Sequence, residues 1–403
     1  MIIGMVAMFD LVGVPYAYYV PHENPPELFQ MVRYATDAQI WRAYWLTVWG
    51  TVMVIAFALL FGVTKGLSEL QWREPAPMSE KSAAAVWWTT FLLQCGAIAV
   101  MFIQAGFSVP MLTLGNATLS DYQDSALLRS YYAGRIDMHI FNVNLLWFST
   151  LNLATAFDAV RSHKWFHRII SVAMFVLSAS FSLAKSPIGA ALVVMTLFVA
   201  VRRPVSVRTV TAMALAIVIC IAPFYLIYAY TADAMGVVEM LAERIFYGQW
   251  AGLPYYFIVF DEKPVSIRSL LPPYVQKVTG GLTDTPGRQL MLFLEPSAAV
   301  EGVAGNIPSF FIGEAYAVAG FAGVMIAPIV AVFELWLMVS CFRLLPKNLF
   351  TQVLLAWFLY RFAIGLLDGA SFMLVSGFSI CLAALVGFTI VRVACRAQKP
   401  TYA

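Results

Sequence analysis

Apolar segments about as long as a membrane-crossing helix recur along the whole chain. A helix needs about 20 mostly apolar residues to cross the hydrocarbon layer of a bilayer. Ten segments meet or nearly meet this length: residues 2–20, 41–63, 84–107, 139–160, 167–184, 186–201, 208–230, 317–342, 349–367 and 371–392. Only 12% of the 403 residues are charged, against about 25% in soluble domains. We therefore predict an all-α fold, a polytopic transmembrane helix bundle with about ten spans.

Basic residues cluster in alternate connections between these segments. With ten spans, the clusters all fall on one side, which the positive-inside bias assigns to the cytoplasm. Both termini are then cytoplasmic. The clusters are Lys65, Arg73 and Lys81; Arg161, Lys164 and Arg168; Arg202, Arg203 and Arg208; Arg343 and Lys347; and Arg392, Arg396 and Lys399.

The longest outward connection, residues 231–316, is rich in proline, glycine and aromatic residues. Its aromatic content argues against disorder, and long ordered connections are usually functional. We expect a large outward-facing loop that carries short interfacial helices. The chain then divides into a first transmembrane block of about seven spans (1–230), this loop (231–316), and the last three spans with a cytoplasmic tail (317–403).

Several common functions lack their sequence signals. There is no GxxxxGK[ST] phosphate loop and no HExxH zinc motif, so neither a P-loop nucleotide site nor a zinc-protease site is expected. His163 and His167 lie in a basic connection, where a topology signal is the favoured interpretation. The net charge of +3 and the scattered basic residues do not favour a nucleic-acid binder. We expect no metal and no cofactor.

Four basic residues at the outer side or inside a span are candidates for phosphate binding. Arg244 and Arg288 lie in the large loop, and a guanidinium can bind phosphate through two parallel hydrogen bonds. Lys185 follows the fifth span, where snorkelling is an equally good explanation. Arg361 lies inside the ninth span, where it binds a ligand or pairs with Asp368.

Carboxylates and glycines mark the end of the large loop. Glu314 precedes the eighth span, where it acts as a general base or as a helix-capping group. Gly320 and Gly323 are three apart, a spacing that favours close helix packing. Arg268 is interpreted as a solvated loop charge.

Three motifs resemble one family of membrane enzymes. Residues 244–257, with Arg-Ile-Phe-Tyr-Gly-Gln and Tyr-Tyr-Phe, resemble the loop of Wzy-type polysaccharide polymerases. Residues 306–323, with Asn-Ile-Pro-Ser, Gly-Glu-Ala-Tyr and Gly-Phe-Ala-Gly, are similar to that family's second outer-loop motif. Residues 182–187 resemble the basic helix junction ahead of the loop. The motifs follow the family's order over residues 140–395.

The resemblance implies a metal-independent glycosyltransferase of the bacterial cytoplasmic (inner) membrane. A growing glycan on polyprenyl pyrophosphate is the donor, and a lipid-linked repeat unit is the acceptor. The product is a surface polysaccharide such as O-antigen or exopolysaccharide, made on the outer face. No nucleotide sugar is required. A chain-length regulator and a flippase are possible protein partners.

Site residues follow from the resemblance together with the charge arguments. Arginines would bind the pyrophosphate and stabilise its developing charge, and a carboxylate would orient or deprotonate the acceptor hydroxyl. The expected catalytic residues are Glu314, Arg244 and Arg288, and the expected substrate-binding residues are Lys185, Arg361, Tyr316, Asn306 and Tyr255.

Two alternatives stay open. A lipid-linked glycan ligase shares this architecture, but such a ligase is expected to place a histidine in the large loop, and residues 231–316 contain none. A transporter or flippase of lipid-linked oligosaccharide is the second alternative. It should show broken helices and charged residues at mid-membrane depth, and Arg361 is the clear sequence candidate for such a charge.

Overall fold

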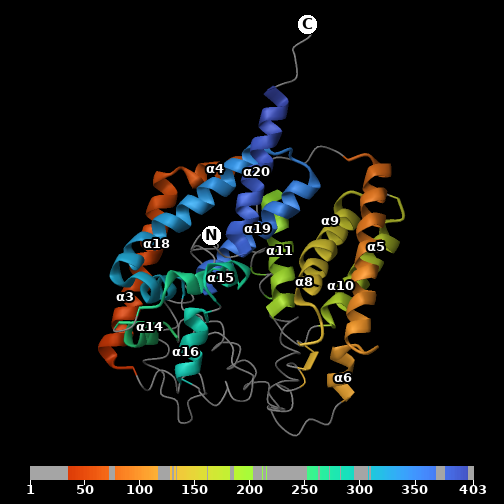
Figure 1. Cartoon of the computed structure of the whole chain (residues 1–403). Helices are drawn as coiled ribbons and strands as arrows, with labels where there is room; N and C mark the ends of the chain where they lie inside the picture. Colours follow the sequence, from red (N-terminus) through yellow and green to blue (C-terminus); the bar gives the residue numbers. More distant parts are fainter. Residues whose placement is uncertain are drawn as a thin grey trace. The chain divides into compact units, whose positions relative to one another are not determined.

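A computed structural model describes most of the chain in detail. The described residues are 35–71, 78–116, 128, 131–132, 134–160, 162–181, 186–202, 211, 215, 252–261, 264–271, 273–281, 283–294, 307, 310–368 and 377–397. All regular elements among them are helices (Figure 1). The predicted all-α class is therefore confirmed for the described part of the chain.

The helices divide by length into long and short elements. The long ones are α3 (Asp37–Leu60), α5 (Glu80–Gln104), α10 (Lys164–Ala179), α11 (Ser186–Arg202), α18 (Phe310–Leu344), α19 (Leu349–Asp368) and α20 (Gly377–Ala397). A continuous run joins α8 (Met138–Asn142), the π-helix η1 (Val143–Ser149) and α9 (Thr150–Asp158). The short ones are α4 (Val63–Gln71), α6 (Pro110–Asn116), α14 (Leu253–Val259), the 3-10 helix η2 (Ile267–Leu270), α15 (Pro273–Thr279) and α16 (Pro286–Leu294).

Among the described residues, five helices are long and apolar enough to cross a membrane: α3, α5, the run Met138–Asp158, α18 and α19. Shorter apolar stretches lie in α11 (Gly189–Arg202) and α20 (Cys381–Arg392), and α10 has 16 residues. The predicted span 2–20 and nearly all of 208–230 lie outside the described residues. The chain is thus a helical membrane protein, while the total of ten spans stays a prediction.

The side chains of α5 are distributed as expected for a helix in lipid. Leu92 is 64% exposed and Ile103 is 60% exposed, whereas Gln94 is fully buried. A soluble helix places its apolar side chains inside and its polar side chains in water. The reversed arrangement on α5 indicates that its outer surface faces hydrocarbon rather than water.

The chain forms two compact units, each assembled from separate segments. Unit 1 contains residues 1–68, 239–345 and 361–403, and unit 2 contains residues 69–238 and 346–360. The large loop from residue 239 onward therefore groups with both earlier and later segments of the chain. The expected division into two transmembrane blocks and an outward loop stays a prediction.

In unit 2, successive helices run in alternating directions. Arg202 at the end of α11 forms an ion pair with Asp158 at the end of α9, and the backbone of Ser162 donates to Glu80 at the start of α5. Three of the predicted cytoplasmic connections thus meet at one end of the unit. At the other end, the backbone N–H of Asp137 donates to Gln104 at the end of α5, 3.0 Å away.

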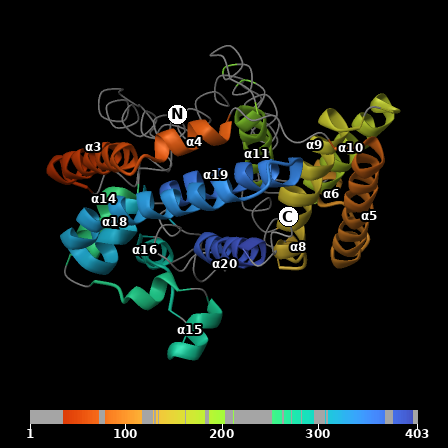
Figure 2. The ribbon, with the colours of Figure 1, turned by 90° about the horizontal axis from the view of Figure 1, so that it is seen from above.

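In unit 1, α3 packs closely against the beginning of α18 (Figure 2). Gly50 of α3 permits this approach, because a Cβ atom at residue 50 would overlap the end of the Ile312 side chain and lie 3.3 Å from Phe311. Ile312 and Phe311 are both buried. The missing side chain at Gly50 therefore determines how near the two helices lie.

Helix α18 is two helices joined by a sharp reversal. Ala319 (φ −133°, ψ 15°) and Gly320 (φ 58°, ψ −145°) leave helical geometry. We call residues 310–318 the short arm and residues 321–344 the long arm. A Cβ atom on Gly323 would overlap the carbonyl group of Ala315, although residues eight apart in a continuous helix are about 12 Å apart. The short arm therefore folds back on the long arm.

This reversal changes the interpretation of the two glycines. Gly323 does permit close packing, but its neighbour is the carbonyl of its own chain rather than another helix. Gly320 has no atom within 4 Å of a built Cβ and is needed for its positive φ. The expectation that Gly320 permits close helix packing is wrong, because Gly320 forms the turn between the two arms.

The expected short helices of the large loop are present as α14, η2, α15 and α16. Three hydrogen bonds tie the segment together: Tyr256 Oη donates to the carbonyl of Ile307 (2.9 Å), the Ile307 N–H donates to Gly287 (3.1 Å), and the Val265 N–H donates to Ala317 (2.7 Å). The loop is a packed layer against the short arm. Its expected position at the outer membrane surface stays a prediction.

Candidate functional site

Three polar side chains from three parts of unit 1 meet at the short arm. Tyr316 of the short arm donates its hydroxyl proton to Oδ1 of Asp261, just after α14. Arg42 of α3 donates from Nη2 to the same hydroxyl oxygen, 3.4 Å away. We call Arg42, Asp261 and Tyr316 the triad.

Aromatic rings hold the Arg42 guanidinium in place. Its Cζ atom lies 5.3 Å from the ring centroid of Phe257 and 5.6 Å from that of Tyr316. Both distances are within the range of cation–π attraction. The two rings meet edge to face, with centroids 4.6 Å apart. The aromatic pair therefore fixes one face of a positive charge without neutralising it.

The triad combines a buried support with accessible charges. Tyr316 is only 3% exposed, whereas the side chains of Arg42 and Asp261 are both exposed. No direct ion pair joins Arg42 to Asp261, although the structure describes both residues. The Tyr316 hydroxyl lies between the two charges and binds each of them. A ligand can reach the guanidinium and the carboxylate together.

Local packing explains why these three residues meet. Arg42 lies two helical turns before Gly50 on α3, so the close packing at Gly50 brings this face of α3 near the short arm. Phe257 lies in α14 with the buried residues Tyr255 and Tyr256, and this layer packs on Ala317 and Leu290. Asp261 follows directly where α14 ends.

The triad has the chemistry of an anion-binding site beside a proton acceptor. A guanidinium has five N–H donors, and the hydrogen bond to Tyr316 is the one recorded for Arg42 among the described residues. The remaining donors suit phosphate oxygens. Ionised Asp261 has about four acceptor positions, of which the Tyr316 hydroxyl occupies one.

Glu314 lies in the short arm, two residues before Tyr316, and is 4% exposed. The short arm begins at Phe310, and no acidic residue lies in its first turn. Helix-dipole stabilisation acts within the first turn. The capping interpretation of Glu314 is therefore not supported, and its expected role as a catalytic carboxylate stays a prediction.

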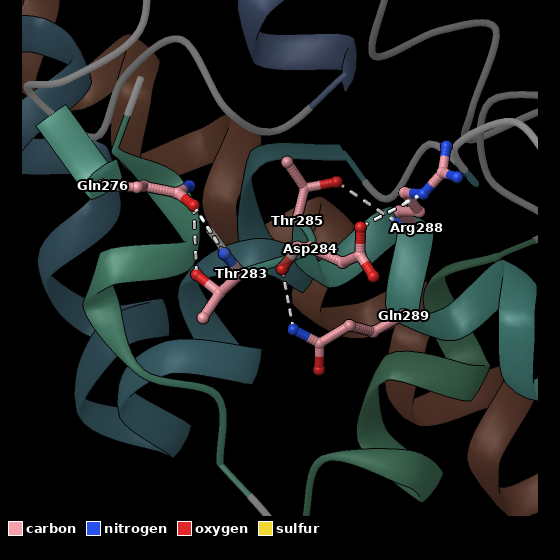
Figure 3. Close-up of polar contacts among 6 residues, drawn as sticks. All are labelled: Gln276, Thr283, Asp284, Thr285, Arg288 and Gln289. Atoms are coloured by element: carbon pink, nitrogen blue, oxygen red, sulfur yellow. Dashed lines mark hydrogen bonds and ion pairs between the residues drawn. The ribbon is translucent and has the colours of Figure 1, made fainter. Parts of the chain in front are cut away.

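Arg288 lies on α16 and forms an ion pair with Asp284 in which Nε and Oδ1 are 3.1 Å apart (Figure 3). Both side chains are about half exposed. Figure 3 shows the guanidinium end of Arg288 extending beyond the carboxylate. An exposed pair of this kind contributes little stability, about 0–1 kcal/mol. Arg288 thus remains accessible to a ligand.

The residues around Arg288 fix the start of α16. Thr285 Oγ1 accepts from the Arg288 N–H (3.3 Å), and Gln289 Nε2 donates to the Asp284 carbonyl (2.7 Å). Gln276 of α15 accepts from the Thr283 N–H (2.7 Å). Figure 3 shows two groups of contacts, Gln276 with Thr283 and the residues 284–289 among themselves, which the chain joins between Thr283 and Asp284. They join α15 to α16 through side-chain bonds to the connecting backbone.

Two further expected site residues, Tyr255 and Arg361, and the loop residue Arg268 fall in different surroundings. Tyr255 is 3% exposed and belongs to the core of the loop layer, so packing accounts for its position, and its expected role in substrate binding stays a prediction. Arg361 is partly exposed within α19, and the side chain of Asp368, its expected partner, lies outside the described residues. Arg268 lies against Gly280 at the end of α15, where a helix dipole favours a cation.

Lys185, Arg244 and Asn306 lie outside the described residues, and their expected roles stay predictions. In the part of the chain that the structure describes, no three His, Cys, Asp or Glu residues group as metal ligands.

Sequence reasoning missed Arg42 and Asp261 as site residues. A signal for Arg42 was present: it is a basic residue at the predicted outer end of a span, opposite to the positive-inside bias. Aromatic neighbours Trp41, Tyr44 and Trp45 surround it in the sequence. Asp261 had no such signal, because it reaches Tyr316 only through the fold of the loop.

Comparisons with protein-family models, curated proteins and solved structures found no match to this chain.

Proposed function

We propose that this protein is a metal-independent membrane glycosyltransferase that polymerises polyprenyl-pyrophosphate-linked oligosaccharide repeat units into a surface polysaccharide. The observation that supports it is the triad: an accessible guanidinium and an accessible carboxylate joined by one buried tyrosine hydroxyl. It lies in a helical membrane protein beside a packed loop layer. This arrangement suits a reaction with an anionic leaving group and a hydroxyl nucleophile.

Arg42 binds the pyrophosphate of the donor in this proposal. The acceptor hydroxyl attacks the anomeric carbon, and a new C–O bond forms as the bond from that carbon to the phosphate oxygen breaks. The leaving lipid pyrophosphate takes the electron pair, and the guanidinium stabilises the negative charge. A fixed guanidinium needs little reorganisation at that moment, and the Phe257 and Tyr316 rings fix it.

Asp261 accepts the proton of the attacking hydroxyl in this proposal. Its carboxylate is exposed, so it is accessible to an acceptor sugar, and its bond to Tyr316 holds its orientation. A positioned base of this kind contributes about 10²–10⁴-fold to a rate. Glu314, Arg244 and Arg288 remain the further catalytic candidates, with Lys185, Arg361 and Asn306 for substrate binding.

Deletion of the gene and complementation with variants test the proposal. The deletion strain should carry single repeat units in place of long polymer, and the unaltered gene should restore the polymer. Asp261→Asn keeps the size of the side chain but removes the proton acceptor, so it should behave like the deletion. Asp137→Asn is the matched control, because Asp137 is an exposed aspartate that caps α8.

Full-length polymer in the deletion strain would refute the proposal. Normal polymer with Asp261→Asn at normal protein level would refute the assigned role of Asp261 while leaving the polymerase activity in place.

One observation favours a transporter or flippase as the second candidate. The sharp break inside α18 is of the kind that transporters use at their substrate sites. The two candidates differ in the fate of the repeat unit. Loss of a polymerase leaves lipid-linked units accessible on the outer face, whereas loss of a flippase retains them on the cytoplasmic face.

A further inference from the structure

A fully buried asparagine in unit 2 has a side chain that the described protein does not satisfy. Asn144 is 0% exposed, and neither its Nδ2 nor its Oδ1 atom has a hydrogen-bond partner among the described residues. The hydroxyl of Thr150, at the start of α9, is also buried (1% exposed) and also has no hydrogen-bond partner among the described residues. Burying an amide without partners costs several kcal/mol, about 2–7 depending on the reference. Such groups are rare in native proteins.

The backbone around Asn144 is unusual in the same place. Residues 143–149 form a π-helix, a form that is rare and frequently found at functional sites. In a π-helix, residues five apart lie one above the other, whereas in an α-helix they are separated by about 140° around the axis. The π-helix thus turns Asn144 to the face of Ser149, and Ser149 Oγ donates to the Asn144 carbonyl (3.0 Å).

That face borders a continuous network of buried hydrogen bonds. Gln94 is its centre: Nε2 donates to Ser149 (2.7 Å) and Ser178 (3.1 Å), and Oε1 accepts from Asn152 Nδ2 (3.0 Å). Asn152 Oδ1 accepts from Ser171 (2.9 Å), whose Oγ accepts from Trp87 Nε1 (2.9 Å). Every member is at most 1% exposed. The Asn144 backbone carbonyl is joined to this network through Ser149, whereas its side-chain amide has no partner among the described residues.

We infer that unit 2 binds a small uncharged hydroxyl group at Asn144. The amide offers a donor and an acceptor side by side, and a hydroxyl or a water molecule both donates and accepts. A charged ligand would need an opposite charge in this buried place, and all seven side chains, Asn144 and the network, are uncharged. The bound group removes the cost of an unsatisfied amide.

Two sources supply this chemistry: a water molecule, or a hydroxyl of a lipid or glycan. A water is the smaller ligand and needs two to four polar partners, of which the Asn144 amide can supply two. The inference stands without the proposed glycosyltransferase function, because it depends only on the buried amide and the π-helix.

An experimental map of the full chain in detergent, detailed enough to show ordered waters, tests the inference. Density should lie about 2.7–3.2 Å from both Nδ2 and Oδ1 of Asn144. A compact peak that persists without added lipid or glycan identifies water. Elongated density that disappears on removal of lipid and glycan identifies a hydroxyl of one of those molecules.

Two variants sharpen the result. Asn144→Leu should abolish the density, and Thr155→Val should retain it, because the Thr155 hydroxyl is satisfied by the Leu151 carbonyl of its own helix (2.7 Å). A wild-type map with no density at the amide, or with the amide bonded to protein groups, would overturn the inference even if Asn144→Leu failed to fold.

Discussion

The hydroxyl of Tyr316 acts both as a hydrogen-bond donor and as an acceptor, and these two bonds determine the arrangement of the triad. A phenolic hydroxyl has one donor and can accept as well. Tyr316 gives its proton to Asp261 and accepts from Arg42. Because the hydroxyl lies between the opposite charges, neither is consumed in a direct ion pair. Each charge keeps hydrogen-bonding positions for a ligand.

Replacing Arg42 tests whether the planar guanidinium matters. Arg42→Lys keeps the charge but loses the fork of donors and the stacking on Phe257, and these groups are not interchangeable at such sites. We expect polymer synthesis to fall about tenfold or more with Arg42→Lys, and further with Arg42→Ala. Quantified glycan on gels, normalised to protein level, is the measurement.

Arg135 provides the matched control. Its guanidinium lies 4.1 Å from the ring centroid of Tyr131, so it makes the same kind of contact in unit 2, outside the triad. Arg135→Lys should leave synthesis unchanged. Equal losses at both positions would show that the effect at Arg42 is structural.

Removing the Tyr316 hydroxyl separates function from packing. Tyr316→Phe keeps the ring beside Arg42 but breaks the bonds to Arg42 and Asp261, so activity should fall strongly while stability changes by about 0.5–1.5 kcal/mol. Tyr256→Phe also loses one buried hydrogen bond, to the Ile307 carbonyl, and should lower stability by a similar amount with activity kept. Thermal unfolding and polymer yield, measured on both variants, decide between these outcomes.

At the scale of elements, the reversal in α18 carries the geometry of the site. The short arm holds Tyr316 and Glu314, and the long arm, about 36 Å at 1.5 Å per residue, is long enough to cross the hydrocarbon layer. Gly320 makes the turn between them with φ 58° and ψ −145°. This backbone region is essentially restricted to glycine.

Gly320→Ala should therefore destabilise the protein by about 1–3 kcal/mol and lower activity, because the short arm carries Tyr316. Gly96→Ala is the control: Gly96 lies within α5 and a Cβ there meets no atom within 4 Å, so alanine should be neutral or stabilising by up to about 1 kcal/mol. Thermal unfolding in detergent measures both. An unchanged midpoint for Gly320→Ala would contradict the turn.

Elements that depend on local sequence were predictable, and those that depend on tertiary contacts were not. Apolar length alone identified α3, α5, α18 and α19, because lipid imposes that length. The break at Gly320 was not foreseen, since the sequence 317–342 reads as one continuous apolar run. Nor was the π-helix over residues 143–149 foreseen, because no local sequence pattern distinguishes it from the α-helix on either side.

The candidate site was predictable only in part. Tyr316 was identified through the Gly-Glu-Ala-Tyr motif, which lies in a single stretch of sequence. Its partners Arg42 and Asp261 are 274 and 55 residues away, and pairing over such separations is decided by helix packing at Gly50 and by the fold of the loop layer. No local sequence pattern predicts that packing.

At the scale of the whole molecule, the proposed function requires the loop layer to lie outside the cell. Val278 of α15 is 88% exposed, and Lys81, exposed near the start of α5, belongs to a predicted cytoplasmic cluster. Single cysteines at these positions, in a background without the five native cysteines, should react differently with a membrane-impermeant maleimide. Val278→Cys should be labelled in intact cells and Lys81→Cys only after permeabilisation. The reverse pattern would exclude a polymerase with this site outside.

Purified protein in liposomes, supplied with lipid-linked repeat units and no nucleotide sugar or metal, tests the proposed activity most directly. The account predicts glycan chains longer than one repeat unit with the unaltered protein, and about 100-fold or more slower chain growth with Asp261→Asn. Single repeat units that cross the bilayer without ever becoming joined would contradict it.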